Sequence, residues 1–294
     1  MKTLIVVANP KSGRGRALSK AEGFAAEAAR SGFSPIVISL LGQERMINEI
    51  HRIVRERRYE IFGIVTVGGD GLLHTLLPTI KEFDIPFTVI PSGTGNDFAR
   101  EIGAMGKSFH DHVATLERPA HQIDSMVIDG EFGVSRACQV LSLGFDALVN
   151  ERANRMRKVK GKAKYVVAMI RELPVFKPIH FQLEVDGEKF SREAMLIAVA
   201  NGPSYGGGMK ILPEAAFDDG MLDILILKRV SIWELIKVFP RVYTGSHIKH
   251  PAVEVLKAKK IKVSAQAKAF ADGEFISRLP ISISVEPRSL SVWK

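Results

Sequence analysis

Short apolar runs alternate with longer amphipathic stretches along the first hundred residues of the chain. Runs rich in β-branched residues predict four buried strands, at 3–8, 35–40, 61–67 and 87–90. Apolar residues at helical spacing predict three helices, at about 16–30, 44–58 and 72–83. Strands that alternate with helices at this spacing indicate βαβ units and a parallel sheet.

The pattern changes near residue 120, because strand-like runs follow one another there with few helices between them. The predicted strands are 122–128, 132–143, 179–185, 189–200, 222–228, 261–264 and 281–285. Asp-Gly pairs at 129–130, 186–187 and 272–273 indicate hairpin turns. Helical patterns remain only at about 147–173 and 231–243. A mainly antiparallel β-sandwich is therefore predicted for this part of the chain.

Two glycine-rich turns follow the third and fourth predicted strands. Residues 68–71 read Gly-Gly-Asp-Gly, and residues 92–97 read Ser-Gly-Thr-Gly-Asn-Asp. Glycine lets the backbone approach a ligand closely, and the start of the following helix favours an anion. A carboxylate beside a phosphate would hold a cation or accept a proton, so Asp70 and Asp97 are candidate catalytic residues. The alternative is that each aspartate only caps a helix.

A basic turn follows the first strand. It contains Asn9, Pro10, Lys11, Ser12 and Gly13, and it lacks the Gly-Lys-Ser/Thr ending of a Walker loop. Its lysine and its backbone N–H groups could still bind phosphate, and a merely solvated basic turn is the alternative. Because ligands of open α/β sheets bind across the carboxyl ends of the strands, all three turns could share one crevice.

The composition is that of an ordinary globular protein, with 46% hydrophobic and 25% charged residues among 294. A net charge of +9 indicates an anionic partner without choosing among nucleotide, nucleic acid and acidic membrane. The single cysteine, Cys138, excludes an internal disulfide and a cysteine-based metal cluster, and it indicates a reducing cytosol. We expect no signal peptide and no transmembrane helix, because no apolar run is long enough.

A basic run lies beside the apolar residues 165–170. Its members are Arg152, Arg155, Arg157, Lys158, Lys160, Lys162 and Lys164. Such a run could dock on anionic lipid headgroups, and the alternative is a solvated helix face.

Taken in order, the motifs resemble those of the bacterial diacylglycerol kinase catalytic family of lipid kinases, over nearly the whole chain. Beyond the two glycine turns, they are Asn201 followed by glycines at 206–208, the stretch 219–223, and Asp272-Gly273-Glu274. The resemblance implies a Rossmann-like, NAD kinase-like α/β nucleotide domain at 1–124, a β-sandwich domain at 125–280 and a catalytic cleft between them. The C-terminal segment 281–294 is expected to pack back on the first domain.

The resemblance also implies ATP and Mg²⁺ as cofactors. The residues expected along ATP are Asn9, Pro10, Lys11, Ser12, Gly13, Gly68, Gly69, Asp70, Gly71 and Thr94. Asp97 would organise the catalytic metal network. A structural Mg²⁺ would bind the Asp219 side chain and the carbonyl groups of Ala216 and Met221, ligands that suit this ion. Asp124 would support that site.

Glu274 matches the family's catalytic carboxylate, which would accept the proton of a lipid hydroxyl as that oxygen attacks the γ-phosphate. Considered alone, the Asp-Gly-Glu sequence is more often just a hairpin turn. The chain departs from the family pattern at Leu72 and Thr75, where a threonine and a glutamate are usual, and it lacks the usual threonine near 40–42.

The first hypothesis is therefore an ATP-dependent lipid kinase, cytoplasmic and peripheral at the inner face of the membrane. Its partners would be ATP, a membrane lipid such as diacylglycerol and an anionic membrane surface, without nucleic acid, and a homodimer is the default oligomer. The alternatives are a soluble-substrate kinase of the NAD kinase type and a catalytically impaired nucleotide- or lipid-binding regulatory protein.

Overall fold

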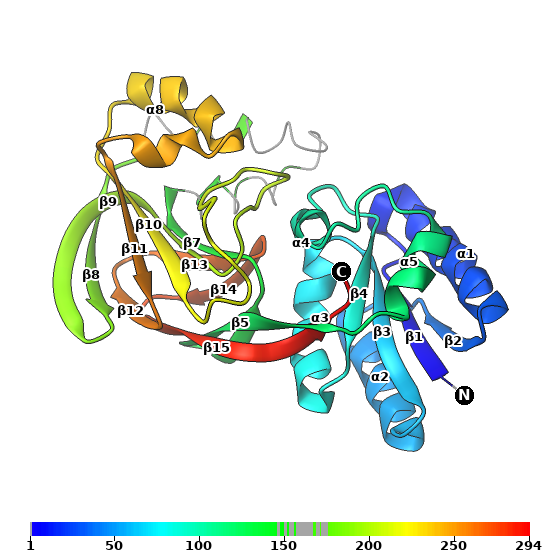
Figure 1. Cartoon of the computed structure of the whole chain (residues 1–294). Coiled ribbons are helices and arrows are strands. Elements are labelled where there is room, and N and C mark those ends of the chain that lie inside the picture. The colour runs from blue at the N-terminus through cyan, green and yellow to red at the C-terminus, as the bar shows by residue number, and fades with distance from the viewer. Residues whose placement is uncertain are drawn as a thin grey trace. The chain divides into compact units, whose positions relative to one another are not determined.

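The computed structural model describes residues 2–145, 148–149, 152, 156, 167–168, 171 and 176–294. The chain divides into two compact units (Figure 1). Unit 1 comprises residues 1–123 and 288–294, and unit 2 comprises residues 124–287. Among the helices of the described residues, none combines the length and the hydropathy that a membrane crossing requires. This division rests on compactness alone. The functional domains predicted from the sequence, at 1–124 with 281–294 and at 125–280, stay a prediction.

Unit 1 is built on parallel strands in the order β2-β1-β3-β4. The strands are β1 (Lys2–Ala8), β2 (Phe33–Ile38), β3 (Ile61–Gly68) and β4 (Phe87–Pro91). The helices are η1 (Ser12–Gly15), α1 (Arg16–Arg30), α2 (Gln43–Arg57), α3 (Asp70–Phe83), α4 (Asp97–Glu101) and α5 (Phe109–Leu116). The alternating α/β fold predicted from the sequence is confirmed.

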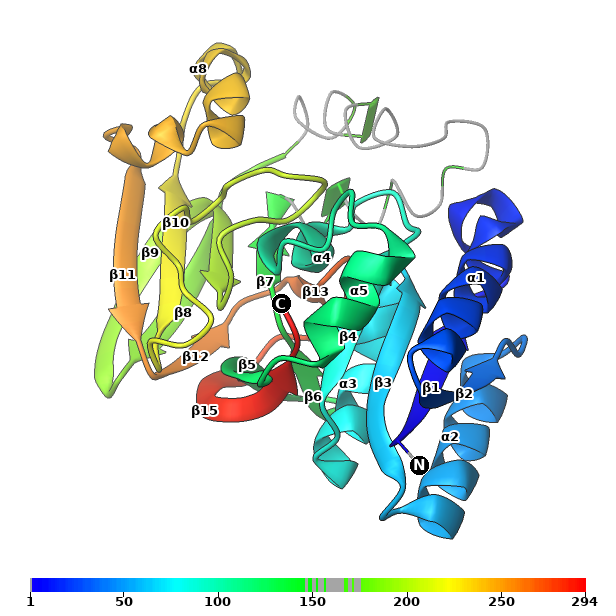
Figure 2. The same ribbon diagram turned by 45° about the vertical axis from the view of Figure 1, so that its right-hand side comes forward.

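The helices cover both faces of this sheet (Figure 2). Helix α1 packs against α5, and α2 packs against α3. Right-handed crossovers put α1 on one face and α2 and α3 on the other, because the chain reverses direction across the sheet after β2. Strand β1 lies between the two layers, and its side chains from Leu4 to Ala8 are completely buried.

The order of the strands in the sheet of unit 1 indicates where a ligand would bind. The chain leaves β1 toward one face and β3 toward the other, and these two strands are neighbours in the sheet. In open α/β sheets the crevice at such a switch point, beyond the carboxyl ends of the strands, is the usual ligand site. The turns after β1 and β3 border that position in unit 1.

Unit 2 is formed mainly by antiparallel strands. They are β5 (His121–Gly130), β6 (Gly133–Ala137), β7 (Val140–Gly144), β8 (Ile179–Val185), β9 (Glu188–Ala200), β10 (Leu222–Lys228), β11 (Val253–Ala258), β12 (Lys260–Ser264), β13 (Lys268–Ala271), β14 (Glu274–Arg278) and β15 (Ile281–Val292). Its helices are α8 (Ile232–Val238), η2 (Phe239–Tyr243) and η3 (Ser246–Lys249). The predicted β-rich second part is confirmed.

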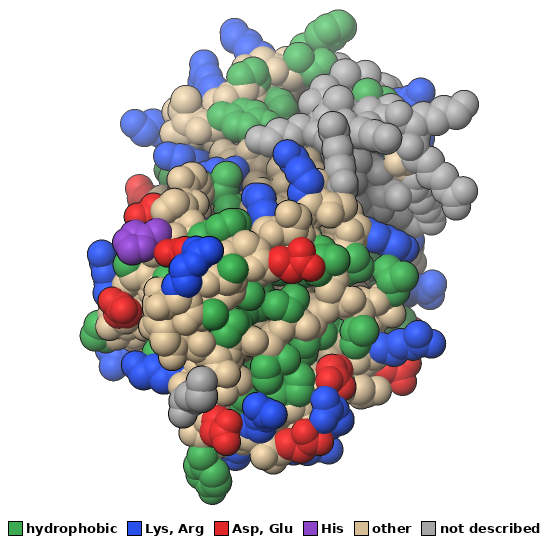
Figure 3. Space-filling view, turned by 90° about the vertical axis from the view of Figure 1, so that its right-hand side faces the viewer, with side chains coloured by type: hydrophobic (Ala, Val, Ile, Leu, Met, Phe, Trp, Pro, Cys, Tyr) green, Lys and Arg blue, Asp and Glu red, His purple; other side chains and the backbone are tan. Residues whose placement is uncertain are grey.

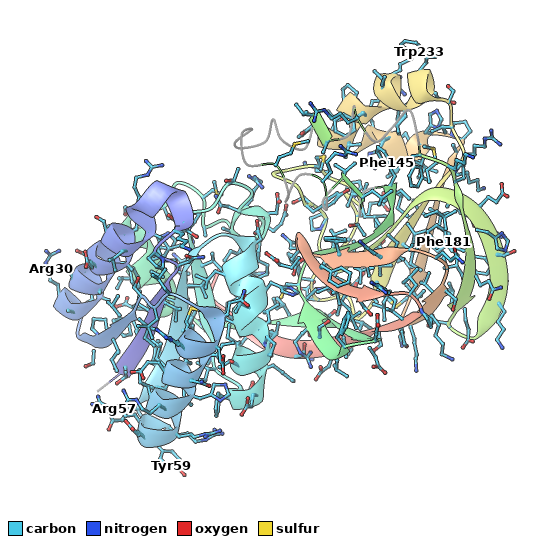
Figure 4. The ribbon with its side chains drawn as sticks, turned by 180° about the vertical axis from the view of Figure 1, so that it is seen from behind. Arg30, Arg57, Tyr59, Phe145, Phe181 and Trp233 are labelled. Carbon is cyan, nitrogen blue, oxygen red and sulfur yellow. The ribbon has the colours of Figure 1, made fainter. Side chains whose placement is uncertain are left out.

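Strand β9 organises this unit. Its first half pairs with β8, and its second half pairs with β7 on one side and β10 on the other. The residues from Ala194 to Ala200 are buried as a result, and they belong to the apolar cores of the unit. Phe181 of β8 is completely buried in the largest of these cores (Figure 4).

Two strand predictions were wrong in extent. The strand expected at 132–143 is two strands, because the backbone N–H groups of Cys138, Gln139 and Val140 donate to the Asp272 carboxylate at the break. The strand expected at 281–285 continues to Val292, where it pairs in parallel with Phe87 of β4. Strands β11, β13 and β14 and helix α5 were not predicted, although the Asp-Gly pair at 272–273 indicated a hairpin turn and a capping box at Ser108 and Asp111 marks the start of α5.

Candidate active site

The turn after β1 is held by its own asparagine. The Asn9 side-chain oxygen accepts a hydrogen bond from the backbone N–H of Lys11 (3.0 Å), and its carbonyl accepts one from Ser12 N–H (2.9 Å). Gly13 has a φ of 59° and lies directly against Ser92, where an added Cβ would be 2.5 Å from the Ser92 hydroxyl oxygen. This turn therefore packs on the loop that follows β4.

The turns after β3 and β4 also meet, backbone against backbone. An added Cβ on Gly93 would lie 2.5 Å from the Cα atom of Gly69. Ser92 N–H donates to the Gly68 carbonyl (2.8 Å) and continues the strand register into the loops. Asn96 closes the second turn by accepting from Gly93 N–H and donating to the Gly93 carbonyl. The three predicted turns are thus brought together at the carboxyl ends of β1, β3 and β4.

The two candidate catalytic aspartates of unit 1 lie at the same corner. Asp70 is the first residue of α3, and its carboxylate accepts a hydrogen bond from Phe98 N–H in α4 (3.2 Å). Asp97 is the first residue of α4, is 4% exposed and pairs with Arg100 at 2.6 Å. Arg100 also donates to the Gly95 carbonyl (3.1 Å). Asn96, rather than Asp97, is the N-cap residue of α4.

This arrangement suits a polyphosphate. Lys11 and Thr94 are exposed at the edge of the three turns, and the glycine backbones at 69 and 93 carry no side chain that would block approach. The starts of α1, α3 and α4 follow these turns, so helix dipoles add positive potential.

The positive charge of the chain is not gathered on the face in Figure 3, where Lys and Arg are interspersed with Asp and Glu.

The two departures from the family pattern have local structural roles. Leu72 is 7% exposed and covers Gly68, because a Cβ on Gly68 would lie 2.7 Å from a Leu72 methyl carbon. The Thr75 hydroxyl donates to the Gly71 carbonyl (2.9 Å) and accepts from the Gln43 side chain of α2 (3.2 Å). Thr75 therefore joins α3 to α2.

Unit 2 presents Glu274 as the first residue of β14, directly after the tight turn at Asp272 and Gly273. Its side chain is exposed, and no hydrogen bond or ion pair engages it within the described part of the chain. Asp272 has a different role, because its carboxylate accepts the N–H groups of the two residues between β6 and β7 and of Val140, the first residue of β7. The hairpin that carries Glu274 is thereby anchored to the sheet of unit 2.

Asp124 anchors the loop predicted to bind Mg²⁺. Its side chain is completely buried and accepts from Gly220 N–H (2.7 Å), and its backbone N–H donates to the Phe217 carbonyl (2.6 Å). Asp219 accepts from Met221 N–H (3.0 Å). The loop at 216–221 is therefore held by unit 2 itself.

A lysine that sequence reasoning missed lies at this loop. The Lys257 ammonium contacts the carboxylates of Asp219 (3.0 Å) and Asp223 (3.4 Å). Burial raises the pKa of Asp223 although Lys257 opposes the shift, and the hydrogen bond to Asp219 raises the pKa of Lys257. Lys257 faces Asp223 only because β11 pairs with β10, and the sequence contains no signal for that pairing.

The helical pattern predicted at about 147–173 falls largely outside the described residues. Within the described ranges, no three His, Cys, Asp or Glu side chains form a metal-binding group. Arg152 is described, whereas Arg155, Arg157, Lys158, Lys160, Lys162 and Lys164 lie outside the described residues. Asn201 is completely buried and donates to the carbonyls of Asp124 and Cys138, so it supports the fold beside the loop.

Comparison with known proteins gives consistent family matches over the chain. Residues 3–128 match the diacylglycerol kinase catalytic domain, and residues 139–294 match the YegS C-terminal NAD kinase beta sandwich-like domain. The chain is 34% identical to a diacylglycerol kinase of Mycobacterium tuberculosis (strain ATCC 25618 / H37Rv) over 97% of this chain and 93% of that protein. It is 30% identical to a diacylglycerol kinase of Bacillus subtilis (strain 168) over 74% and 72%, respectively.

A solved structure has the same fold. A putative diacylglycerol kinase from Bacillus anthracis str. Sterne superposes with a TM-score of 0.75 at 20% sequence identity, covering 99% of this chain and 94% of that one. At that identity the similarity supports the fold alone.

Proposed function

Because the chain belongs to the bacterial diacylglycerol kinase catalytic domain family, we propose that it transfers the γ-phosphate of ATP to the hydroxyl group of a diacylglycerol-class membrane lipid. The relationship confirms the enzyme class predicted from the motifs, an ATP-dependent lipid kinase. We propose in addition the lipid acceptor, the site residues, the use of Mg²⁺ and the contact with a membrane.

The observation that carries the proposal is the meeting of three turns in unit 1. Gly13 lies against Ser92, and Gly69 lies against Gly93, so the turns after β1, β3 and β4 form one continuous backbone surface. The phosphates of ATP would lie on this surface, along residues 9–13 and 68–71 and beside Thr94. Lys11 would add a positive charge, and the backbone N–H groups would bind the phosphate oxygens.

Asp70 and Asp97 would act on the reacting phosphate through cations. Two carboxylates at one corner would repel the triphosphate unless positive charge lies between them. Arg100 supplies part of that charge at Asp97, at 2.6 Å. When bound, Mg²⁺ would neutralise the charge that develops on the transferring phosphoryl group. The aspartates would orient the triphosphate in this way.

Glu274 would act as the general base. Its carboxylate is exposed and not engaged by other described residues, whereas the neighbouring Asp272 is used to hold the hairpin. An unengaged carboxylate can accept the proton of a lipid hydroxyl. We therefore assign to Glu274 the removal of that proton as the hydroxyl oxygen attacks the γ-phosphate.

The loop at 216–221 fits a divalent cation in its chemistry. It offers a carboxylate at Asp219 and backbone carbonyls at Ala216 and Met221, the mixed oxygen ligands that Mg²⁺ takes. Asp124 holds the loop in place through Gly220. The Lys257 ammonium contacts the Asp219 carboxylate at 3.0 Å, so Mg²⁺ would have to compete with Lys257 for that group.

Leu72 and Thr75 favour the alternative of a catalytically impaired protein, because each replaces a polar family residue by one used in packing or in a helix contact. The NAD kinase alternative has no such observation in its favour.

A cytoplasmic location, contact with the inner face of the membrane and a homodimer stay predictions.

The test is transfer of labelled γ-phosphate from ATP with Mg²⁺ into diacylglycerol in mixed detergent micelles, with a nicotinamide nucleotide as the competing acceptor. We expect label in the lipid, and loss of that label in Glu274→Gln. Asp129→Asn, at an Asp-Gly hairpin turn without an assigned role, is the matched control and should retain activity. ATP binding without transfer to any acceptor would favour the regulatory alternative.

A further inference from the structure

The outer side of α8 and η2 in unit 2 carries large apolar side chains that are open to solvent. Trp233 is 79% exposed, Ile236 is 48% exposed and Tyr243 is 45% exposed. Trp233 projects from the end of α8 away from the rest of the unit (Figure 4). Trp233 and Ile236 are three residues apart and therefore share one side of the helix.

The opposite side of the same segment is packed, which fixes its orientation. Leu235 packs against the core cluster that contains Phe145 and Met195. Val242 packs against the cluster that contains Ile211 and Leu212. The Ser231 hydroxyl caps the start of α8 by accepting from Glu234 N–H (3.2 Å). The exposed tryptophan, isoleucine and tyrosine are thus presented by an anchored element.

Basic residues occur along the same segment as these apolar side chains. Between residues 229 and 249 the chain has four lysines or arginines and one acidic residue. Lys237, Arg241 and Lys249 are exposed, and no carboxylate of the described residues pairs with them. The single acid, Glu234, is engaged by the His250 ring at 3.1 Å. The face therefore combines apolar anchors with uncompensated positive charge.

We infer that this face, formed by Trp233, Ile236, Lys237, Arg241 and Tyr243 and called here the α8 surface, docks on an anionic phospholipid bilayer. Tryptophan and tyrosine rings suit the headgroup level of a membrane, where one end is apolar and the other is wet. Lysine and arginine beside them attract acidic lipids. The inference rests on the proposed function in one respect, since a kinase that acts on a membrane lipid has to reach the bilayer.

A bilayer fits this surface better than a protein partner or a second copy. Stable protein interfaces use about 20–30 residues on each side, with depletion of charge at their centre. The α8 surface has three exposed apolar side chains, and Lys237 and Arg241 lie between the first and the last of them in the sequence. A few apolar side chains with basic neighbours are sufficient for reversible attachment to an anionic membrane.

Intrinsic fluorescence provides a direct test, because the chain has only two tryptophans. Trp293 is 3% exposed, and its ring N–H donates to the Arg118 carbonyl in unit 1 (3.1 Å). Changes in emission on adding vesicles therefore report Trp233. With phosphatidylcholine vesicles that contain phosphatidylglycerol, we expect a shift to shorter wavelength and reduced quenching by acrylamide. An unchanged spectrum and unchanged quenching would overturn the inference.

Vesicle co-sedimentation of the full chain tests the residues. Trp233→Ala combined with Ile236→Ala should weaken binding to these vesicles at least tenfold. The matched control is Phe132→Ala with Val134→Ala, which removes two exposed apolar side chains elsewhere in unit 2 (68% and 70% exposed) and should bind as the unchanged protein does. Equal losses in both pairs, or a change of oligomeric state in the α8 pair alone, would contradict the inference.

A kinase assay separates this inference from the proposed function. With diacylglycerol in detergent micelles, the Trp233 and Ile236 variant should retain the basal activity, because no bilayer has to be reached. If the unchanged protein transfers no phosphate but Trp233 still responds to anionic vesicles, the proposed function fails and the α8 surface stands. If transfer in micelles is normal while Trp233 does not respond, the inference fails alone.

Discussion

Gly69 and Gly93 touch through their backbones, and an added Cβ on Gly93 would lie 2.5 Å from the Gly69 Cα atom. Neither glycine has a positive φ, so the requirement for glycine here comes from space rather than from backbone conformation. This contact joins the turn after β3 to the turn after β4, and both turns carry a candidate catalytic aspartate.

Gly93→Ala should therefore separate the two turns. We expect a loss of about 1–3 kcal/mol in the free energy of unfolding, the usual cost of forcing extra atoms into a packed site, together with weaker ATP binding. Gly69→Ala should have a smaller effect, because its added Cβ would be 3.0 Å from the Gly93 Cα atom. Chemical denaturation measures the free energy of unfolding of the two variants, and calorimetric titration measures their ATP binding. A Gly93→Ala protein with unchanged stability and unchanged ATP binding would contradict the contact.

Asp97 and Glu274 should respond differently to substitution. Both Asp97→Asn and Glu274→Gln should lower phosphoryl transfer by a factor of about 10² or more, because Glu274 would take the proton of the attacking hydroxyl and Asp97 would position the cations at the triphosphate. Asp97→Asn should also destabilise unit 1 by about 1–3 kcal/mol, because it breaks a charged contact to Arg100 at a nearly buried position.

Glu274→Gln should change the free energy of unfolding by less than about 0.5 kcal/mol, because the Glu274 side chain is exposed. Thermal unfolding of both variants beside the kinase assay separates the two roles. A Glu274→Gln protein that unfolds early would reassign this residue to the structure of the hairpin.

Lys257→Met should increase the affinity of unit 2 for Mg²⁺. The substitution removes the ammonium that contacts Asp219 and Asp223 and leaves two carboxylates close to the loop at 216–221. We expect the stabilisation by Mg²⁺ in a thermal melt to begin at several-fold lower concentration. Lys262→Met, which breaks the exposed pair with Glu184, is the control and should not change it. Weaker Mg²⁺ stabilisation in Lys257→Met would mean that the loop does not bind the ion.

His112 should make the stability of unit 1 depend on pH. Burial lowers the pKa of this imidazole from 6.5 to about 4, and the charges of Lys107 and Lys20 act in the same direction. The unfolded chain then binds the proton more readily, so stability is lost as pH falls from about 6.5 toward 4, by about 3 kcal/mol at most.

The check is the free energy of unfolding at several pH values for the unchanged protein and for His112→Gln. The variant should have a smaller slope between pH 6.5 and 4 and the same slope above pH 7. Equal slopes at acid pH would show that His112 does not remain neutral in the folded state.

Much of the fold was predictable from local patterns. β-Branched runs separated by amphipathic helices identified β1, β3 and β4 within one or two residues, because period and residue type depend only on near neighbours. The break in the strand expected at 132–143 was not predictable in this way. It depends on Asp272, which is more than 130 residues further along the chain and accepts the N–H groups of Cys138 and Gln139.

The sequence alone determined the chemical types at the candidate site: glycine turns after parallel strands, Asp70 and Asp97 beside them, and Glu274 in a hairpin. The tertiary structure decided which of these groups are engaged. It buried Asp97 against Arg100, used Asp272 as an anchor and brought Lys257 to Asp219. The physical reason is that hydrogen bonds, ion pairs and burial depend on distance in space, whereas the sequence specifies only distance along the chain.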